Sequence, residues 1–238
     1  IASRIRSRRR AVIILSAVLI SLSFATAALA QQAEPAPLSP EQRKALMQSN
    51  DSHSADAYLE ILKSGDENSK RMAIHALGNL REPRAVEPLI APLKDSDPVV
   101  IMTATRALQQ IGDERAIDPI IALAKTGSPE VKRVALSALN YPFKPDARIL
   151  EALVQGLAEE DSSLRKSAAR GLALYNSPEW RDRSAAALKK ACSDSDAGVR
   201  AAAFNALANR GALDDDLIAL GIKDAAPEVR RAAAQAPR

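Results

Sequence analysis

Apolar residues recur along the chain with the spacing of one face of an α-helix, and the pattern itself repeats. In one copy, Val131, Val134, Ala135, Ala138 and Leu139 fall on a single helical face. Alanine at the centre of the face indicates that neighbouring helices approach closely. Aligned on this Ala-x-x-x-Leu core, successive leucines are 31, 31, 33 and 35 residues apart, and the alanines of the six copies are Ala73, Ala104, Ala135, Ala168, Ala203 and Ala233.

A second, shorter helical segment lies between consecutive copies, as in AVEPLIAPLK and AIDPIIALAK. Asp97-Pro98 and Ser128-Pro129 place a capping side chain before a proline, which is a helix start signal. Pro92 lies one turn inside its segment and predicts a bend or break there. Three glycines predict the turns between the two helices of a pair, namely Gly78, Gly112 and Gly211.

One such helix pair cannot bury its apolar face alone, so the period predicts a stack of pairs. The motif D-x-x-V-R-x-x-A-x-x-A-L, carried by Asp196, Val199, Arg200, Ala203 and the residues that follow, resembles the HEAT-like repeats of the phycobilisome-lyase type. The resemblance implies an all-α, right-handed α-solenoid of about five to six helix pairs, a HEAT/armadillo-like superhelix over residues 54–238. Relatives of this type include chromophore lyases, metal-dependent hydroxylases and many scaffolds.

The first thirty residues have the pattern of a secretory signal peptide. Five arginines precede a long apolar stretch that ends in Ala28-Leu29-Ala30, a cleavage pattern. Cleavage would send the chain out of the cytoplasm, to the periplasm in a Gram-negative bacterium, with no membrane span left. An uncleaved N-terminal anchor is the alternative. Residues 31–53 then form a polar spacer and an N-terminal helix.

The charge of the chain gives no reason to expect a nucleic-acid partner. The formal net charge is +4, but five of the basic residues belong to the leader. The remainder has 28 basic and 29 acidic residues. A balanced repeat region lacks the basic footprint that nucleic acids require.

Candidate catalytic groups are few, so no catalytic, cofactor-binding or metal-ligating residues are predicted. The only histidines are His53 and His75, and neither belongs to the His-Glu dipeptides that the metal-dependent relatives use. His75 shares its repeat position with polar residues, which indicates a solvated face. Cys192 aligns with core positions and reads as a small buried side chain rather than a reactive thiol.

An acidic column is the first candidate for a partner-binding surface. Four second helices carry an acidic residue at the same place, namely Glu87, Asp118, Glu151 and Asp216. Stacking would align them into a stripe suited to a basic peptide. The structural alternative is that they complement helix dipoles or pair with basic residues of the first helices, namely Lys70, Lys132, Arg165, Arg200 and Arg230.

Aromatic residues in two long loops are the second candidate. Tyr141 and Phe143 lie in NYPFKPD, and Tyr175 and Trp180 lie in YNSPEWRD. Loop aromatics can anchor a partner, or they can fill the wider gap between stacked units.

These observations predict an exported scaffold that binds protein or peptide partners and is not an enzyme. One alternative is a lyase- or hydroxylase-related enzyme of the same repeat superfamily. Another is a structural repeat module of a larger protein.

Overall fold

The computed structural model describes residues 52–141 and 143–235, with side chains from residue 54 onward. The predicted signal peptide and most of the polar spacer lie outside these residues. All described residues belong to one compact unit, Ala45–Arg238. Within them the secondary structure is entirely helical, as the repeat pattern predicts. None of the described helices combines the length and the apolar content needed to cross a membrane.

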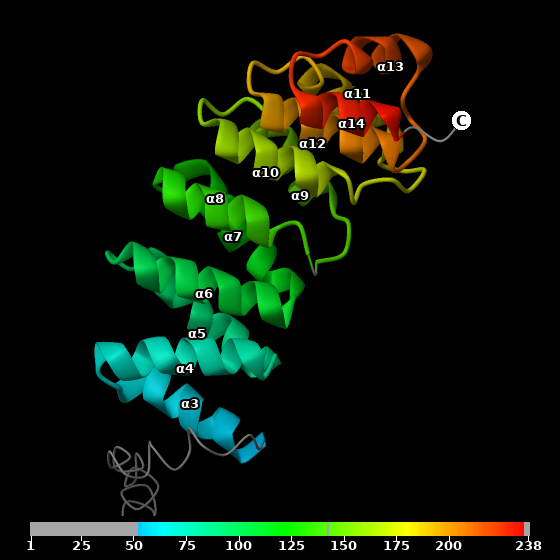
Figure 1. The fold of residues 1–238 in the computed structure, drawn as a ribbon. Coiled ribbons are helices and arrows are strands. Elements are labelled where there is room, and N and C mark those ends of the chain that lie inside the picture. The colour runs from blue at the N-terminus through cyan, green and yellow to red at the C-terminus, as the bar shows by residue number, and fades with distance from the viewer. Residues whose placement is uncertain (1–51, 142, 236–238) are drawn as a thin grey trace, which may run out of the picture. The chain divides into compact units, whose positions relative to one another are not determined.

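Twelve α-helices and three 3₁₀ segments follow one another along the described chain (Figure 1). The helices are α3 (Ser52–Ser64), α4 (Glu67–Asn79), α5 (Val86–Ile90), α6 (Pro98–Ile111), α7 (Ile117–Thr126), α8 (Pro129–Ala138), α9 (Ala147–Gly156), α10 (Ser162–Leu172), α11 (Arg181–Ala191), α12 (Ala197–Ala208), α13 (Asp215–Ile222) and α14 (Pro227–Ala234). The 3₁₀ segments are η1 (Pro83–Ala85), η2 (Ala91–Lys94) and η3 (Glu114–Ala116).

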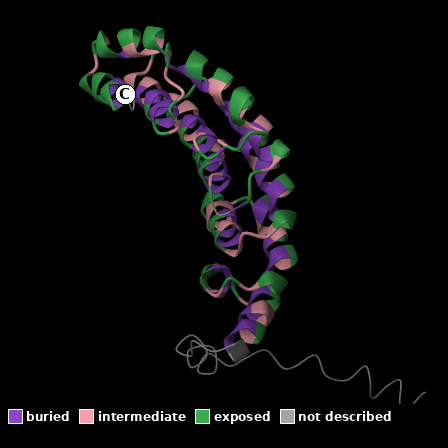
Figure 2. Ribbon diagram, turned by 90° about the vertical axis from the view of Figure 1, so that its right-hand side faces the viewer, coloured by how far each residue is buried: buried purple, intermediate pink, exposed green. Residues whose placement is uncertain are grey.

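The helices alternate between two layers. One layer, here called the first-helix layer, holds the helices that carry the repeated alanine of the Ala-x-x-x-Leu core. It contains α4, α6, α8, α10, α12 and α14, and each contacts the next. The second-helix layer contains α3, α5, α7, α9, α11 and α13. Figure 2 shows the buried residues between the layers and exposed residues on their outer sides. This is an α-solenoid of stacked helix pairs.

The start signals in the sequence act as predicted. The Asp97 side chain accepts a hydrogen bond from the Val99 backbone N–H at 2.8 Å, and Ser128 caps α8 in the same way. These side chains satisfy amides that have no partner inside the helix. The same cap position is filled in three further first helices by Asp66, Asp161 and Asp196. Pro92 also has its predicted effect, because the α-helical segment stops at Ile90 and continues as η2.

The pairing of the helices differs from the sequence prediction. The helices that pack most closely as neighbours in sequence are α3–α4, α7–α8 and α13–α14. The first two pairs are joined by loops with a capping aspartate or serine, and in the third Ala226 at the cap position provides no side-chain cap. The glycine turns instead link one pair to the next. Both connections are short, so loop length alone does not show which of them closes a pair. With this pairing, the described residues form six pairs, from α3–α4 to α13–α14, which agrees with the predicted five to six.

Two of the three predicted glycine turns are confirmed. Gly112 and Gly211 have φ angles of 72° and 63°, in the left-handed region that favours glycine. Gly78 lies inside α4 instead, and the turn that follows uses Arg81 at φ 51°. The reason is packing, since a Cβ on Gly78 would lie 2.7 Å from Cα of Ala107 on the adjacent α6. Gly78 therefore allows two first helices to touch.

Candidate partner-binding surfaces

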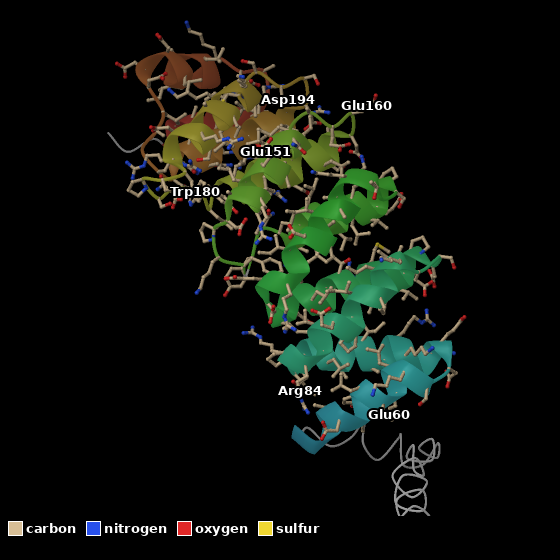
Figure 3. All side chains as sticks on the ribbon, turned by 180° about the vertical axis from the view of Figure 1, so that it is seen from behind. Glu60, Arg84, Glu151, Glu160, Trp180 and Asp194 are labelled. Atoms are coloured by element: carbon tan, nitrogen blue, oxygen red, sulfur yellow. The ribbon has the colours of Figure 1, made fainter. Side chains whose placement is uncertain are left out.

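Three members of the acidic column form ion pairs with arginines of the following repeat. Asp118 Oδ2 lies 2.8 Å from Arg148 Nη1, and Glu87 Oε1 lies 3.6 Å from Arg115 Nη1. Glu151, labelled in Figure 3, pairs with Arg183. No ion pair within the described residues involves the fourth member, Asp216.

Two of these arginines, Arg115 and Arg148, are also held by the cap residue of the helical segment in which they lie. The guanidinium of Arg148 donates to Asp146, and Asp146 accepts the Arg148 backbone N–H at 2.7 Å. Its hydrogen bonds from Arg148 keep the pKa of Asp146 below its usual value. Equivalent pairs are Asp113 with Arg115 and Glu82 with Arg84, of which Arg84 is labelled in Figure 3. Arg84, Arg115 and Arg148 thus each join two carboxylates, and Arg183 joins α11 to Glu151 of α9. Together they make an ion-pair ladder along the second-helix layer.

This ladder favours the structural interpretation of the acidic column, but with different partners from those predicted. The basic residues of the first helices pair elsewhere. Arg165 binds both carboxylate oxygens of Asp194, and Arg200 binds Asp224 in the same way. Lys132 pairs with Glu159 at 3.1 Å. Arg165 and Arg200 reach across to the loop of the next repeat. Together with Lys132 they form a second set of ion pairs, here called the clamps, which is separate from the ladder.

The clamps bind backbone as well as carboxylate. Arg165 Nη1 donates to the carbonyls of Glu159 and Glu160, at 2.9 and 2.7 Å, in the loop between α9 and α10. Arg200 does the same for Asp194 and Ser195 after α11. These carbonyls belong to loops and have no helical partner, so a guanidinium that binds them satisfies backbone acceptors and holds the connection to the next helix in place.

The loop aromatics divide into buried and exposed residues. Phe143 and Tyr175 are buried, and the Tyr175 hydroxyl donates to the Asp146 carbonyl at 3.2 Å. Trp180 is half-buried and contacts the Tyr175 ring edge-on, with ring centroids 6.4 Å apart. Tyr141 is 71% exposed. Phe143 and Tyr175 therefore fill the space between units, and Tyr141 is the member best placed to touch a partner.

The structure also locates the residues for which no chemistry is predicted. Cys192 is buried, and burial, with a contribution from nearby Asp214, raises its thiol pKa to about 12. The thiol is therefore protonated at neutral pH and is not a nucleophile. His75 lies exposed on α4 beside Asn79. Across residues 54–141 and 143–235, no group of three or more His, Cys, Asp or Glu side chains is arranged to hold a metal ion.

A basic surface covers the exposed face of the first-helix layer. Two positions of each first helix, one turn apart, line this face: the position of His75 and the position four residues before it. Neither row contains an acidic residue. The cations of these two rows, here called the basic rows, are Arg71, Arg106, Arg133, Lys166, Arg170 and Arg231.

These cations differ from the arginines of the ladder and the clamps. Among the described residues, no carboxylate lies within ion-pair distance of any of the six. The sequence analysis predicts that the His75 row is a solvated face, but it does not identify the basic surface. Aligning the His75 row with the row four residues before it would have revealed this surface, because both rows follow from the repeat alone.

The basic rows border a groove of about 500 Å³ across α10, α12 and α14. Its floor on α12 is made of small residues, including Gly198, Ala201 and Ala202. Lys166 and Arg170 line one side from α10, and the α14 side is lined by Glu228 and Arg231. The three helices lie side by side in the upper part of Figure 1.

Stacked helix pairs joined by ion pairs between repeats define an α-solenoid built from helical repeats. The sequence matches the HEAT repeats family over residues 55–140 and 150–237, which correspond to α3–α8 and to most of α9–α14. The chain belongs to the HEAT-repeat family. The comparison with curated proteins gave no match.

Solved structures agree with this assignment. One is a chain from the complex of CpcE and CpcF of phycocyanin lyase from Nostoc sp. PCC7120, with 27% identity, a TM-score of 0.54, and coverage of 66% of this chain and 99% of that chain. A computationally designed armadillo repeat protein for modular peptide recognition has 22% identity, a TM-score of 0.55, and coverage of 75% and 96%. Another designed armadillo repeat protein, in complex with the peptide (KR)4, has 22% identity, a TM-score of 0.54, and coverage of 78% and 92%.

Proposed function

We propose that this protein is an exported scaffold that binds protein or peptide partners, in the periplasm if the source is Gram-negative. The observation that carries the proposal is the contrast between its two surfaces. On the second-helix layer, most acidic-column charges are used in ion pairs between repeats. On the first-helix layer, four cations of the basic rows are exposed, Arg71 and Lys166 are half-buried, and none of the six has a carboxylate partner among the described residues. Unpaired charges on a regular, rigid surface are suited to recognising a partner.

The similar structures support a binding role by analogy. Two of the designed armadillo proteins are described by peptide recognition or by a bound peptide. At 22% identity they share the fold with this chain and no particular contact. The acidic column and the aromatic loops stay a second candidate surface, in which Tyr141 is the most accessible aromatic residue.

An enzyme related to the chromophore lyases is the alternative function. The similarity to a chain of the phycocyanin lyase complex favours it. A lyase relative should bind a chromophore, and a hydroxylase relative should contain stoichiometric metal. An absorption spectrum and a metal analysis of the purified protein distinguish both from a scaffold, because a scaffold should show neither.

Partner binding is tested by crosslinking in living cells. The full chain carries a photoreactive amino acid at Arg106 in the basic rows or, as a matched control, at Lys63, which is exposed on α3. We expect the Arg106 position to give a discrete crosslinked protein and the Lys63 position to give none. No crosslink from the basic rows, together with a bound chromophore or metal, would contradict the scaffold.

Export needs its own measurement. The N-terminal sequence of the protein recovered from the exported compartment should begin at Gln31. A protein that retains its first thirty residues and sediments with membranes would support the anchored alternative.

A further inference from the structure

The groove across α10, α12 and α14 has a shallow floor and charged sides. Ala201 and Ala202 on its floor are more than nine-tenths buried. A Cβ on Gly198 would lie 3.0 Å from Lys166 Nζ, so the ammonium group extends over the first turn of α12. The small side chains thus leave an open strip of α12 between the cations on α10 and those on α14.

The charge of the lining is positive. Lys166, Arg170 and Arg231 supply three cations, and Glu228 is the one carboxylate among the residues that line the groove. None of the three cations has an ion-pair partner among the described residues. In the ladder, by contrast, Arg115 and Arg148 each contact two carboxylates. The groove cations are therefore available to an external anionic group.

The groove also offers groups that recognise a peptide backbone. Asn205 and Asn209 are exposed on its α12 side. A carboxamide both donates and accepts hydrogen bonds, which matches the alternating N–H and C=O groups of an extended chain. Adjacent helices pack about 8–10 Å apart, so the width from α10 to α14 is about 20 Å. An extended segment of about six to eight residues covers that distance.

We infer that this groove binds an extended, acidic peptide segment of a partner protein. The inference rests on the proposed scaffold function and specifies the chemistry of its partner. Aspartate and glutamate side chains would lie against Lys166, Arg170 and Arg231, and the peptide backbone would lie over the small residues of α12. A nucleic acid fits less well, because no aromatic side chain lines the groove to stack against bases.

Fluorescence anisotropy with three probes tests the inference. The probes are a labelled acidic octapeptide, (DE)4, the basic octapeptide (KR)4, and a single-stranded oligonucleotide of eight nucleotides. The full chain is kept in a mild detergent because residues 11–30 form a long apolar stretch. We expect (DE)4 to bind most tightly and its affinity to fall as salt is raised.

A charge-matched pair of variants locates the binding. The groove variant carries Lys166→Gln, Arg170→Gln and Arg231→Gln. The control variant removes the same charge from the ladder, with Arg115→Gln, Arg148→Gln and Arg183→Gln. Because one exposed ion pair contributes roughly two- to threefold to an equilibrium, the groove variant should bind (DE)4 about ten- to thirtyfold more weakly. The control should change the affinity less than about twofold at physiological salt.

Each result supports or overturns the inference. An equal loss of (DE)4 affinity in both variants would show that binding depends on net charge only, which overturns the inference. Tighter binding of (KR)4 or of the oligonucleotide than of (DE)4 would show that an acidic peptide is the wrong class of partner. Circular dichroism confirms that both variants are folded. If crosslinking finds a partner whose capture is unchanged in the groove variant, the scaffold function stands and this groove assignment fails. If no partner is captured and a chromophore is bound, the proposed function itself fails.

Discussion

Replacing Arg165 by methionine should destabilise the fold far more than an equivalent change in the ion-pair ladder. Arg165 makes two hydrogen bonds to Asp194, at 2.8 and 2.9 Å, and two to the carbonyls of Glu159 and Glu160 in the loop between α9 and α10. The side chains of Arg165 and Asp194 are only 13% and 12% exposed. Methionine retains the length of the side chain and removes its charge, these hydrogen bonds and a longer one to Ser195 Oγ at 3.5 Å.

The expected loss of stability follows from the largely buried Asp194 carboxylate, which the substitution leaves without its arginine partner. Removing one partner of a buried ion pair costs about 3–5 kcal/mol, and an exposed pair is worth about 0–1 kcal/mol. The Arg165 clamp is largely but not fully buried, so we expect a loss of about 2–4 kcal/mol. The control is Arg148→Met, whose side chain is 45% exposed and should cost about 1 kcal/mol or less.

Urea unfolding followed by circular dichroism measures both variants. Repeat proteins can unfold in parts, so hydrogen exchange of α9 and α10 should accompany it and should show faster exchange in Arg165→Met than in Arg148→Met. Equal destabilisation by the two variants would refute the reasoning that burial separates the clamps from the ladder.

The pH dependence gives an independent check of the same clamp. Hydrogen bonds from Arg165 hold the pKa of Asp194 below its usual value. A carboxyl whose folded pKa is lowered contributes stability that is present above its unfolded pKa, near 4, and is lost as pH falls through the folded pKa. Acid destabilisation of the wild type below about pH 4 should therefore be steeper than that of Arg165→Met.

Three further predictions follow from single contacts. Gly221→Ala should lower the melting temperature by several degrees, since a Cβ there would lie 2.7 Å from the buried ring of Phe204. Cys192 should remain unmodified by maleimide in the folded protein and react only in denaturant, and labelling at native conditions would contradict its burial and raised pKa. Neutralising three acidic-column residues should cost no more than about 1–2 kcal/mol in denaturant unfolding, because their ion pairs are exposed; a larger loss would mean that the ladder is a main source of stability. That variant carries Glu87→Gln, Asp118→Asn and Glu151→Gln.

The sequence predicts the elements of this fold well because their signals are local. An aspartate or serine at a cap position acts on the amide two or three residues later, and Pro92 acts on its own helix. The period between alanine cores likewise predicts the stacking of helices. Each of these signals can be evaluated without knowing what the rest of the chain does.

Signals that depend on several repeats at once were harder to interpret. The acidic column was found by alignment, but its partner arginines lie in the next helical segment of the second-helix layer, beyond connections of unequal length. The pairs Glu87–Arg115, Asp118–Arg148 and Glu151–Arg183 therefore have three different sequence separations. The predicted turn at Gly78 was wrong for a similar reason, since the need for glycine there is set by Ala107 on another helix.

The distribution of ion pairs separates residues that hold the solenoid together from residues that are free to bind. Arg165 and Arg200 each bind a carboxylate and loop carbonyls, so the fold itself accounts for their charge. Arg106 and Arg170 occupy equivalent places in their repeats, are exposed, and contact no carboxylate among the described residues. An exposed, unpaired arginine adds little to stability, so the fold gives no reason for a row that alternates such cations with uncharged polar residues. A surface that recognises an acidic partner does give one, because cations spaced by the repeat can each meet a carboxylate along an extended chain.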